Sequence, residues 1–338
     1  MNRSLLFAIG MVAVGGLLQG SFAAPMKRVA GWRWENVWLL FALFGLLVFP
    51  WIFTFVTVPH VSRVYAEASI TTEVKVVGFG LLWGVGSTLF GLGISRVGMG
   101  LGFALILGIT ASFGSLLPLA ILHPEQLVTK RGIALILGTV IMLLGLALLA
   151  LAGRARDHAL KTSNGVNSGF TLGFVICIFS GVFSSMLNFS FVFGDELRLR
   201  ALEAGAGKAM AANTVWALAV TGGFLSNCVY CVYLLNKNRA WSAFGKGNPF
   251  INWLLAGSMG WLWFGGIVIY GIGAASLGSL GSIVGWPIFM AVIIIAALFW
   301  GACFGEWKDA PRKALVYNWA GVGVLLLAIG VISAGNTG

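Results

Sequence analysis

Charged residues are scarce in this sequence. Asp, Glu, Lys and Arg together make up 9% of the 338 residues, whereas hydrophobic residues make up 59%. A soluble globular domain is about 25% charged, so this composition excludes water as the main solvent of the chain. The 48 glycines and 14 tryptophans fit a lipid environment, where glycine permits close helix contact and tryptophan collects at the membrane interfaces.

Groups that bind metals or perform acid–base chemistry are equally few. The three histidines, His60, His123 and His158, are scattered among predicted loops. The four cysteines lie in apolar runs, and the C-x-x-C pair Cys228 and Cys231 has no second pair to complete a zinc site. A phosphate-binding lysine motif is also absent from the sequence. The sequence therefore predicts no enzyme, no metal site, no cofactor and no ATP-driven pump.

Long apolar runs are what the sequence has in abundance. A helix needs about 20 mostly apolar residues to cross a membrane. Runs of this kind occur at about 5–24, 36–57, 75–95, 99–122, 132–153, 168–193, 211–235, 250–272, 282–305 and 314–334. The first run resembles a secretory signal, but further spans follow it, so we interpret it as an uncleaved first helix. The predicted fold is an all-α integral membrane protein with ten transmembrane helices.

The basic residues indicate the orientation of these helices. They are scattered in short segments between the apolar runs and form no patch of the kind that binds nucleic acid, although the net charge is +11. With the amino terminus outside, 13 of the 21 Lys and Arg residues fall in the inner connections and 8 in the outer ones. Because the excess of positive charge is cytoplasmic in most membrane proteins, we expect both termini outside a bacterial-type inner membrane.

The two halves of the chain resemble each other. Trp83, Gly91, Gly93 and Gly98 recur 180 positions later, as Trp263, Gly271, Gly273 and Gly278. Residues 1–153 would form one five-helix repeat and residues 168–338 a second, joined by a cytoplasmic linker at 154–167. Because five is an odd number, the second repeat would enter the membrane in the opposite sense. Inverted repeats are common in transporters, with the solute site between the repeats near the midplane.

Four blocks of residues resemble a known family. They are Ala24-Pro25-Met26-Lys27-Arg28-Val29 with Trp32, Trp34-Glu35 and Trp38; Trp83-Gly84-Val85-Gly86 with Phe90-Gly91-Leu92, Arg96 and Gly98-Met99 to Gly102; Cys177-Ile178-Phe179-Ser180-Gly181 with Met186 and Asn188; and Gly222-Gly223 with Asn227 and Glu306-Trp307. With these blocks the chain looks like the L-rhamnose–proton symporter family of the drug/metabolite transporter superfamily, over nearly its whole length. The resemblance implies a ten-helix secondary active transporter that imports a deoxyhexose by alternating access, coupled to protons.

One position departs from the family pattern. The resemblance implies an acidic residue early in the ninth helix, a few positions before a tryptophan, and this sequence has Ser282 before Trp286. This departure leaves an alternative open, namely a carrier or exporter of another small polar metabolite without proton coupling.

Polar and aromatic residues within the spans are the candidates for solute binding. Polar side chains in lipid are unfavourable unless they are paired or face a cavity, and a sugar needs both hydrogen-bonding groups and aromatic faces. The predicted substrate-binding residues are Gln19, Ser21, Trp83, Ser87, Ser185, Asn188, Trp263, Tyr270, Ser282 and Trp286. The predicted partners are this sugar and membrane lipid, with no nucleic acid and no prediction of oligomeric state.

Gating and coupling have fewer candidates. Arg96 lies between the third and fourth spans and could form a gate with Glu35 or Glu306 at the cytoplasmic side. Because the helix interiors contain no Asp, Glu or His, the titratable residues near span ends, among them Glu35, are expected to be solvated. Trp38 is expected to anchor the chain at the membrane interface. Protons are a possible coupling ion that the residues themselves support only weakly.

Overall fold

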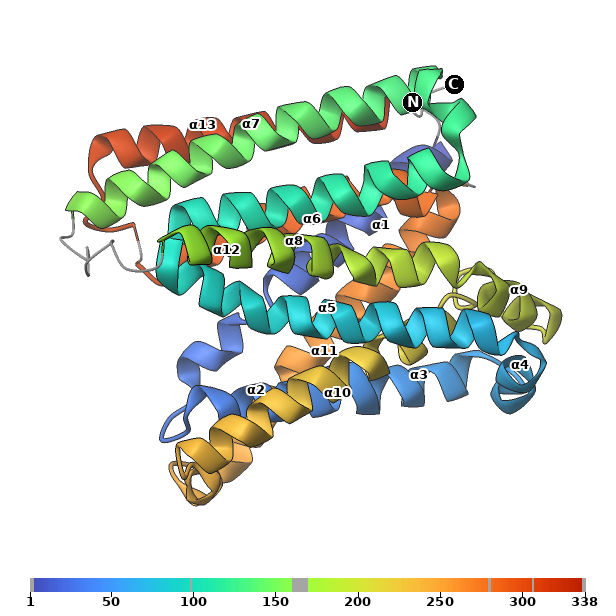
Figure 1. Ribbon diagram of the computed structural model, residues 1–338, viewed down its shortest axis with the longest axis horizontal. Coiled ribbons are helices and arrows are strands. Elements are labelled where there is room, and N and C mark those ends of the chain that lie inside the picture. The colour runs from blue at the N-terminus through green and yellow to red at the C-terminus, as the bar shows by residue number, and fades with distance from the viewer. Residues whose placement is uncertain (1–2, 98, 160–169, 279–280, 306, 336–338) are drawn as a thin grey trace.

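A computed structural model describes residues 3–97, 99–159, 170–278, 281–305 and 307–335 of the chain (Figure 1). Helices dominate these residues because a chain in lipid must satisfy its backbone hydrogen bonds within each segment. In chain order the elements are α1 (Arg3–Gly20), η1 (Ala24–Arg28), α2 (Trp34–Ala42), η2 (Leu43–Val48), α3 (Phe49–Thr57), α4 (Val61–Glu67), α5 (Ile70–Val97), α6 (Met99–Leu122), η3 (Pro124–Val128), α7 (Lys130–Ala159), α8 (Phe170–Phe193), α9 (Asp195–Glu203), α10 (Asn213–Lys237), η4 (Trp241–Gly245), α11 (Pro249–Ser276), α12 (Gly281–Cys303) and α13 (Arg312–Ala334).

The predicted membrane spans are confirmed. Ten helical segments within the described ranges are long and apolar enough to cross a membrane, and each overlaps one predicted run. Both chain ends lie at the same end of the bundle, together with α4 and α9 (Figure 1). We call this the terminal end, and the end with η1 and η4 the opposite end. This arrangement, with the start of α1 and the end of α13 on one side, agrees with an even number of spans.

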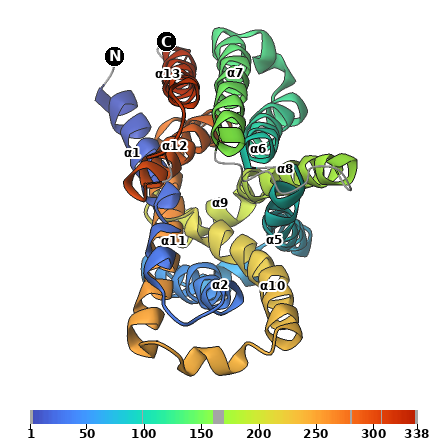
Figure 2. The same cartoon turned by 90° about the vertical axis from the view of Figure 1, so that its left-hand side faces the viewer.

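The helices pack in pairs that repeat across the two halves. Helix α5 packs on α8 and on α10, while α11 packs on α1 and on α2. Helix α6 packs on α8 as α12 packs on α1. Figure 2, seen from the opposite end, has α1 and α11 on one side and α5 and α8 on the other. This pairing is compatible with two five-helix repeats, and α7 with α13 forms a separate pair at one edge.

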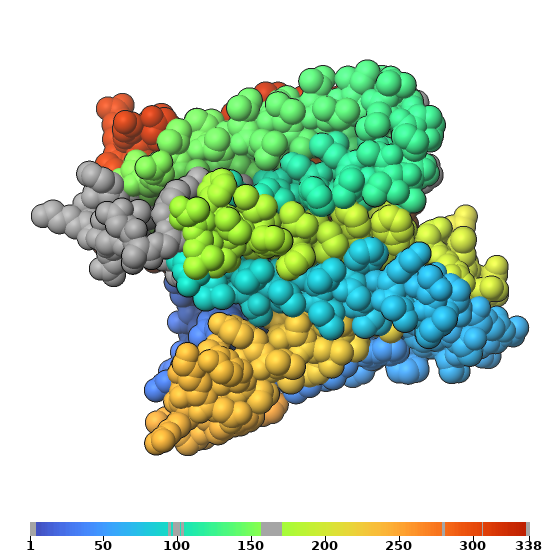
Figure 3. Space-filling view, viewed as in Figure 1, coloured from blue at the N-terminus to red at the C-terminus, as the bar shows by residue number. Residues whose placement is uncertain are grey.

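Small residues allow α5 and α10 to cross closely. A Cβ atom at Gly80 would lie 1.8 Å from the carbonyl oxygen of Ala219, and one at Gly84 would lie 2.8 Å from that of Gly223. Small residues at such crossings let two backbones approach in lipid. Beyond the crossing the two helices diverge towards the opposite end (Figures 1 and 3). The bundle is therefore tighter at its terminal end along this side.

The second span is interrupted by a π-helix. Segment η2 separates α2 from α3, and the Phe49 amide donates to the carbonyl of Phe44, five residues earlier. Pro50 follows directly, and proline lacks the amide hydrogen that an α-helix would use to bond Leu46. The wider turn accommodates this missing bond, and π turns of this kind are frequent at functional sites.

Candidate functional site

The equivalent tryptophans of the two halves meet in the middle of the molecule. The rings of Trp83 on α5 and Trp263 on α11 have centroids 5.2 Å apart and planes inclined by 34°. The ring of Phe41 on α2 approaches Trp263 edge-on, at 6.3 Å. Trp263 is 6% exposed, whereas Trp83 is only partly covered. Two predicted site residues thus form an aromatic contact halfway along their helices.

Asn227 on α10 accepts two hydrogen bonds, one from Trp38 and one from Ser87. The indole nitrogen of Trp38 donates to the Asn227 carbonyl oxygen at 2.9 Å, and the Ser87 hydroxyl donates to the same oxygen at 3.2 Å. Ser87 lies one turn along α5 from Trp83. Trp38 was expected at the membrane interface, but its indole instead bonds inside the bundle, because the first turn of α2 brings it against α10. We define the central cluster as these residues and a glutamine described next: Gln19, Trp38, Phe41, Trp83, Ser87, Asn227 and Trp263.

Gln19 packs against α11 one turn from Trp263. A Cβ atom at Gly266, one turn along α11 from Trp263, would lie 2.9 Å from the Cβ atom of Gln19. The Gln19 side chain is 7% exposed and forms no hydrogen bond with any residue that the structure describes. Its amide atoms are also not among the fully covered polar atoms without a partner, so they retain some accessible surface. Gln19 is therefore a free polar group beside an aromatic face.

Four other predicted residues lie together nearer the terminal end. The Asn188 amide nitrogen donates to the carbonyl of Gly114 at 2.6 Å, and the Tyr270 hydroxyl donates to the carbonyl of Ser282 at 2.9 Å and to Asn188 at 3.3 Å. The Trp286 indole nitrogen donates to the carbonyl of Thr110 at 3.2 Å. These groups join α6, α8, α11 and α12. We call Asn188, Tyr270, Ser282 and Trp286 the Tyr270 cluster.

The Tyr270 cluster is closed in this structure. Asn188 and Tyr270 are 0% exposed and Trp286 is 2% exposed. The ring of Phe289 stacks on Tyr270 with centroids 4.5 Å apart. Because protein groups already satisfy the Asn188 amide, it offers no free group to a solute in this conformation. Tyr270 lies two turns along α11 from Trp263, towards the terminal end.

Two predicted serines lie outside both clusters. The Ser185 hydroxyl donates to the carbonyl of Val182 in its own helix at 2.6 Å. The Ser21 hydroxyl donates to Leu17 at 2.7 Å and accepts a hydrogen bond from the Trp300 indole at 2.7 Å. Serine in a membrane helix commonly bonds back to its own backbone in this way. Both residues therefore connect or stabilise helices in this structure.

Within the described residues, no hydrogen bond or ion pair joins the gating candidates Arg96 and Glu35. Arg96, in the last turn of α5, is exposed, and Glu306 lies outside the described residues. Glu35 was expected to be solvated, but it is 5% exposed. The first turn of α2 packs against the end of α10, where the Asn238 amide nitrogen donates to the Glu35 carboxylate at 2.9 Å. No pattern in the sequence distinguishes this burial from an exposed position at a span end.

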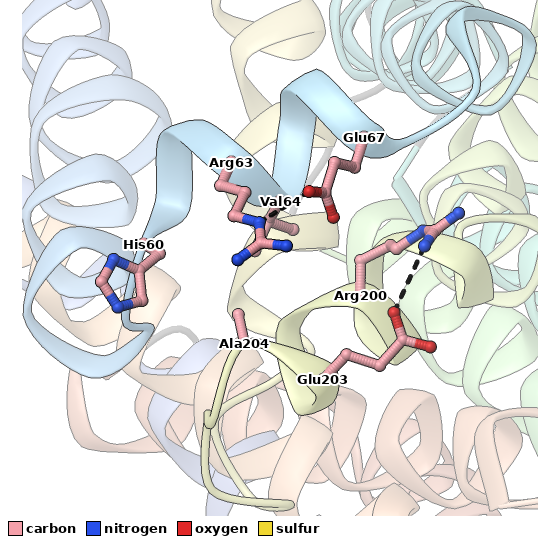
Figure 4. A pocket seen from close by; sticks show the side chains of 7 residues that line it. All are labelled: His60, Arg63, Val64, Glu67, Arg200, Glu203 and Ala204. Carbon is pink, nitrogen blue, oxygen red and sulfur yellow. Dashed lines mark hydrogen bonds and ion pairs between the residues drawn. The ribbon is translucent and has the colours of Figure 1, made fainter.

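A surface hollow lies far from these residues, at the terminal end. It has a volume of about 260 Å³ and lies between α4 and α9. Figure 4 shows its charged side chains in pairs, Arg63 with Glu67 and Arg200 with Glu203. The hydrogen bond from Arg63 lowers the pKa of the Glu67 carboxyl. The Arg63 side chain is 72% exposed, and no predicted site residue lines the hollow, so we do not assign it to transport.

The central cluster has the chemistry of a site for a polyhydroxylated solute. Its aromatic faces can pack against the C–H surfaces of a sugar. The Gln19 amide can exchange hydrogen bonds with sugar hydroxyls. The Ser87 hydroxyl also donates to the carbonyl of Gly84 in its own helix at 2.7 Å, and the Asn227 amide nitrogen donates to the carbonyl of Gly223 at 2.8 Å, so these two groups must exchange those bonds before they can bind a sugar. Within the described part of the chain no group of His, Cys, Asp and Glu side chains could hold a metal ion.

Comparison with known proteins agrees with this chemistry. The family of L-rhamnose-proton symport proteins (RhaT) matches residues 1–338. Proteins named L-rhamnose-proton symporter from Yersinia pestis (strain Pestoides F) and Yersinia pseudotuberculosis serotype O:1b (strain IP 31758) are 27% identical to this chain over 342 residues, covering 99% of each sequence. These relatives are transporters rather than enzymes. The chain, a multi-pass membrane protein, belongs to the L-rhamnose-proton symport protein family.

Proposed function

We propose that this protein imports L-rhamnose, or a closely similar deoxyhexose, together with protons across a bacterial inner membrane. The observation that carries the proposal is the contact of Trp83 and Trp263 beside the free amide of Gln19, halfway through the bundle. The names of the relatives support the substrate and the coupling ion. In the proposed complex the sugar packs on the uncovered part of Trp83 and bonds to Gln19, while Ser87 and Asn227 bind it by exchanging their present bonds to Gly84 and Gly223.

Transport in this proposal proceeds by alternating access between two five-helix repeats. The paired packing of α5 on α8 and α11 on α1 supports the repeats, with residues 1–153 and 168–338 in opposite orientations. The closed Tyr270 cluster lies on the side of the central cluster towards the terminal end. The divergence of α5 and α10 favours access from the opposite end. The excess of positive charge at that end supports a cytoplasmic position for it, with both termini outside.

Uptake by purified protein in liposomes tests the proposal. Labelled L-rhamnose is offered with and without an inward proton gradient, and saturable uptake that the gradient accelerates is the expected result. One proton per sugar permits an accumulation ratio of about tenfold for each pH unit, since both gradients follow the same logarithmic law. Competition by L-mannose, which carries a hydroxyl on C6, measures selectivity for the deoxy sugar.

Two results would contradict parts of the proposal separately. Absence of saturable rhamnose uptake from a folded, monodisperse preparation removes the sugar assignment. Saturable uptake that is indifferent to the proton gradient retains the sugar and removes the coupling.

A further inference from the structure

Glu35 is a buried carboxylate in an unusual position. Buried charged side chains in the described part of the chain comprise Glu35, at 5% exposure, and Arg156, at 7%. Other carboxylates, such as Glu73 in the first turn of α5, are half-buried or exposed. An ionisable residue inside a membrane protein is unfavourable and commonly has a functional role.

The partner of Glu35 is a neutral amide. The Asn238 nitrogen donates to Glu35 Oε1 at 2.9 Å, and the adjacent Asn36 amide donates to the carbonyl of Ala240 at 3.0 Å. The structure gives the Glu35 carboxylate no ion pair with a described cation. An asparagine amide contains both a donor and an acceptor. It can therefore donate to the ionised carboxylate and, after rotation, accept from the protonated acid.

The other described charged and titratable groups near α2 do not bond to Glu35, so the Asn238 amide remains its main contact. On α10, Cys231 is buried near the carboxylate, and the Lys237 ammonium lies over the ring of Tyr233 at 5.6 Å. Arg33 and Arg239 are exposed, as is Lys246 beyond η4. Helix α11 brings Asn252, which bonds to the backbone of Ala30, and no charged residue into this contact region.

Glu35 is also connected to the central cluster. Trp38 lies one turn further along α2, about 5 Å along the helix axis. Its indole bonds to Asn227, which accepts a hydrogen bond from Ser87. The proposed sugar site and the carboxylate are therefore joined through α2 and through α10, where Asn227 bonds to Trp38 and Asn238, at the C-cap, bonds to Glu35. A change in sugar occupancy at Trp38 can act on Glu35 through the first turn of α2.

We infer that Glu35 is the residue that carries the coupled proton. The inference rests on the proposed function. The carboxylate would take up one proton from the side where the sugar binds and release it at the opposite end, so that one sugar and one proton cross together. The Asn238 amide serves both forms of the acid.

The test compares Glu35→Gln with the matched change Glu73→Gln in liposomes containing the full chain. Glu73 also lies in the first turn of a spanning helix but is more exposed. Three quantities are measured: exchange of labelled for unlabelled L-rhamnose, accumulation driven by a pH gradient, and proton uptake triggered by L-rhamnose. We expect Glu35→Gln to retain exchange while its accumulation ratio falls to about one and its sugar-triggered proton uptake disappears, because a glutamine cannot bind the proton. Glu73→Gln is expected to retain all three.

Other outcomes overturn the inference. If Glu35→Gln still concentrates L-rhamnose, another residue carries the proton. If both Glu35→Gln and Glu35→Asp lose exchange, the carboxylate has a structural role instead. Restored accumulation in Glu35→Asp, with an altered pH profile, supports proton transfer. If the wild-type protein does not exchange L-rhamnose, the proposed function is wrong. That result is distinguishable from failure of the Glu35 inference, which requires a wild-type protein that exchanges the sugar.

Discussion

The aromatic residues at the centre combine two roles. Trp263 is covered by Phe41 on one side and contacts Trp83 on the other. These ring contacts hold Trp263 in place, so the position of its ring does not depend on a bound sugar. Trp83, by contrast, is half-covered and packs on Gly223, where a Cβ atom would lie 2.4 Å from the ring. A larger residue at position 223 would therefore displace the aromatic face that is proposed to meet the solute.

Replacement of Trp263 by alanine should weaken sugar binding. Loss of an aromatic face that also supports Trp83 costs about 1.5 kcal/mol, which corresponds to roughly a tenfold loss of affinity for L-rhamnose. The affinity is measured by the concentration dependence of exchange in liposomes. Trp319→Ala on α13, whose side chain is 69% exposed, is the matched control and should leave the affinity unchanged. Equal effects of the two changes would mean that Trp263 is not at the solute site.

At the scale of the helices, close crossings hold one end of the bundle tight. The α5–α10 crossing at Gly80 and Gly84 lies on the terminal side of Ser87 and Asn227. At the terminal end itself, Glu196 of α9 accepts hydrogen bonds from the backbone amide of Ser69 at 2.8 Å and from its hydroxyl at 2.6 Å. These contacts join the two halves of the chain. Opening of the terminal end must loosen them.

A pair of glycines on α5 tests the close crossing. Gly80→Ala should lower the free energy of unfolding by about 1–3 kcal/mol, because its Cβ atom would meet the Ala219 backbone, which cannot move aside. Gly78→Ala meets nothing within 4 Å and should be neutral or stabilising by up to about 1 kcal/mol. Thermal unfolding in detergent measures both. A Gly80→Ala protein as stable as Gly78→Ala would contradict the close approach of α5 and α10.

For the whole molecule, the two ends differ in charge and in packing. The opposite end has most of the Lys and Arg residues, and α5 diverges there from α10. The α7–α13 pair stands apart from the central cluster, at the edge of the bundle, and is therefore suited to remain still during transport.

Labelling of single cysteines should determine the orientation. Ser62→Cys on α4 and Ser242→Cys in η4 are exposed at the two ends, and each is introduced into a chain without its four native cysteines. In right-side-out vesicles a membrane-impermeant maleimide should label Ser62→Cys at once and Ser242→Cys only after permeabilisation, if the end with more Lys and Arg residues is cytoplasmic as proposed. The reverse pattern would show that both termini are inside.

The sequence predicted the spanning helices correctly, but it predicted only some of the contacts that the site residues make. The ten spans follow from apolar length, and the two tryptophans related by the 180-residue offset, Trp83 and Trp263, are in contact, which is compatible with the predicted repeat. The predicted site residues, however, divide into the central cluster and the Tyr270 cluster, while Ser21 and Ser185 bond to their own helices. Trp38 and Glu35 were expected near water and lie against α10 instead. Hydropathy records how apolar a helix is, but it does not record which face a neighbouring helix covers.

The amino-acid sequence by itself determined that this chain crosses a membrane ten times, because long runs without charge can satisfy their backbone only as helices in lipid. The family also follows from the sequence alone. Only the tertiary structure decided that Asn227 faces Ser87 and Trp38, that Asn188 is sealed at Tyr270, and that Asn238 covers Glu35. These contacts join helices distant in the chain, and their geometry depends on where glycines let two backbones approach.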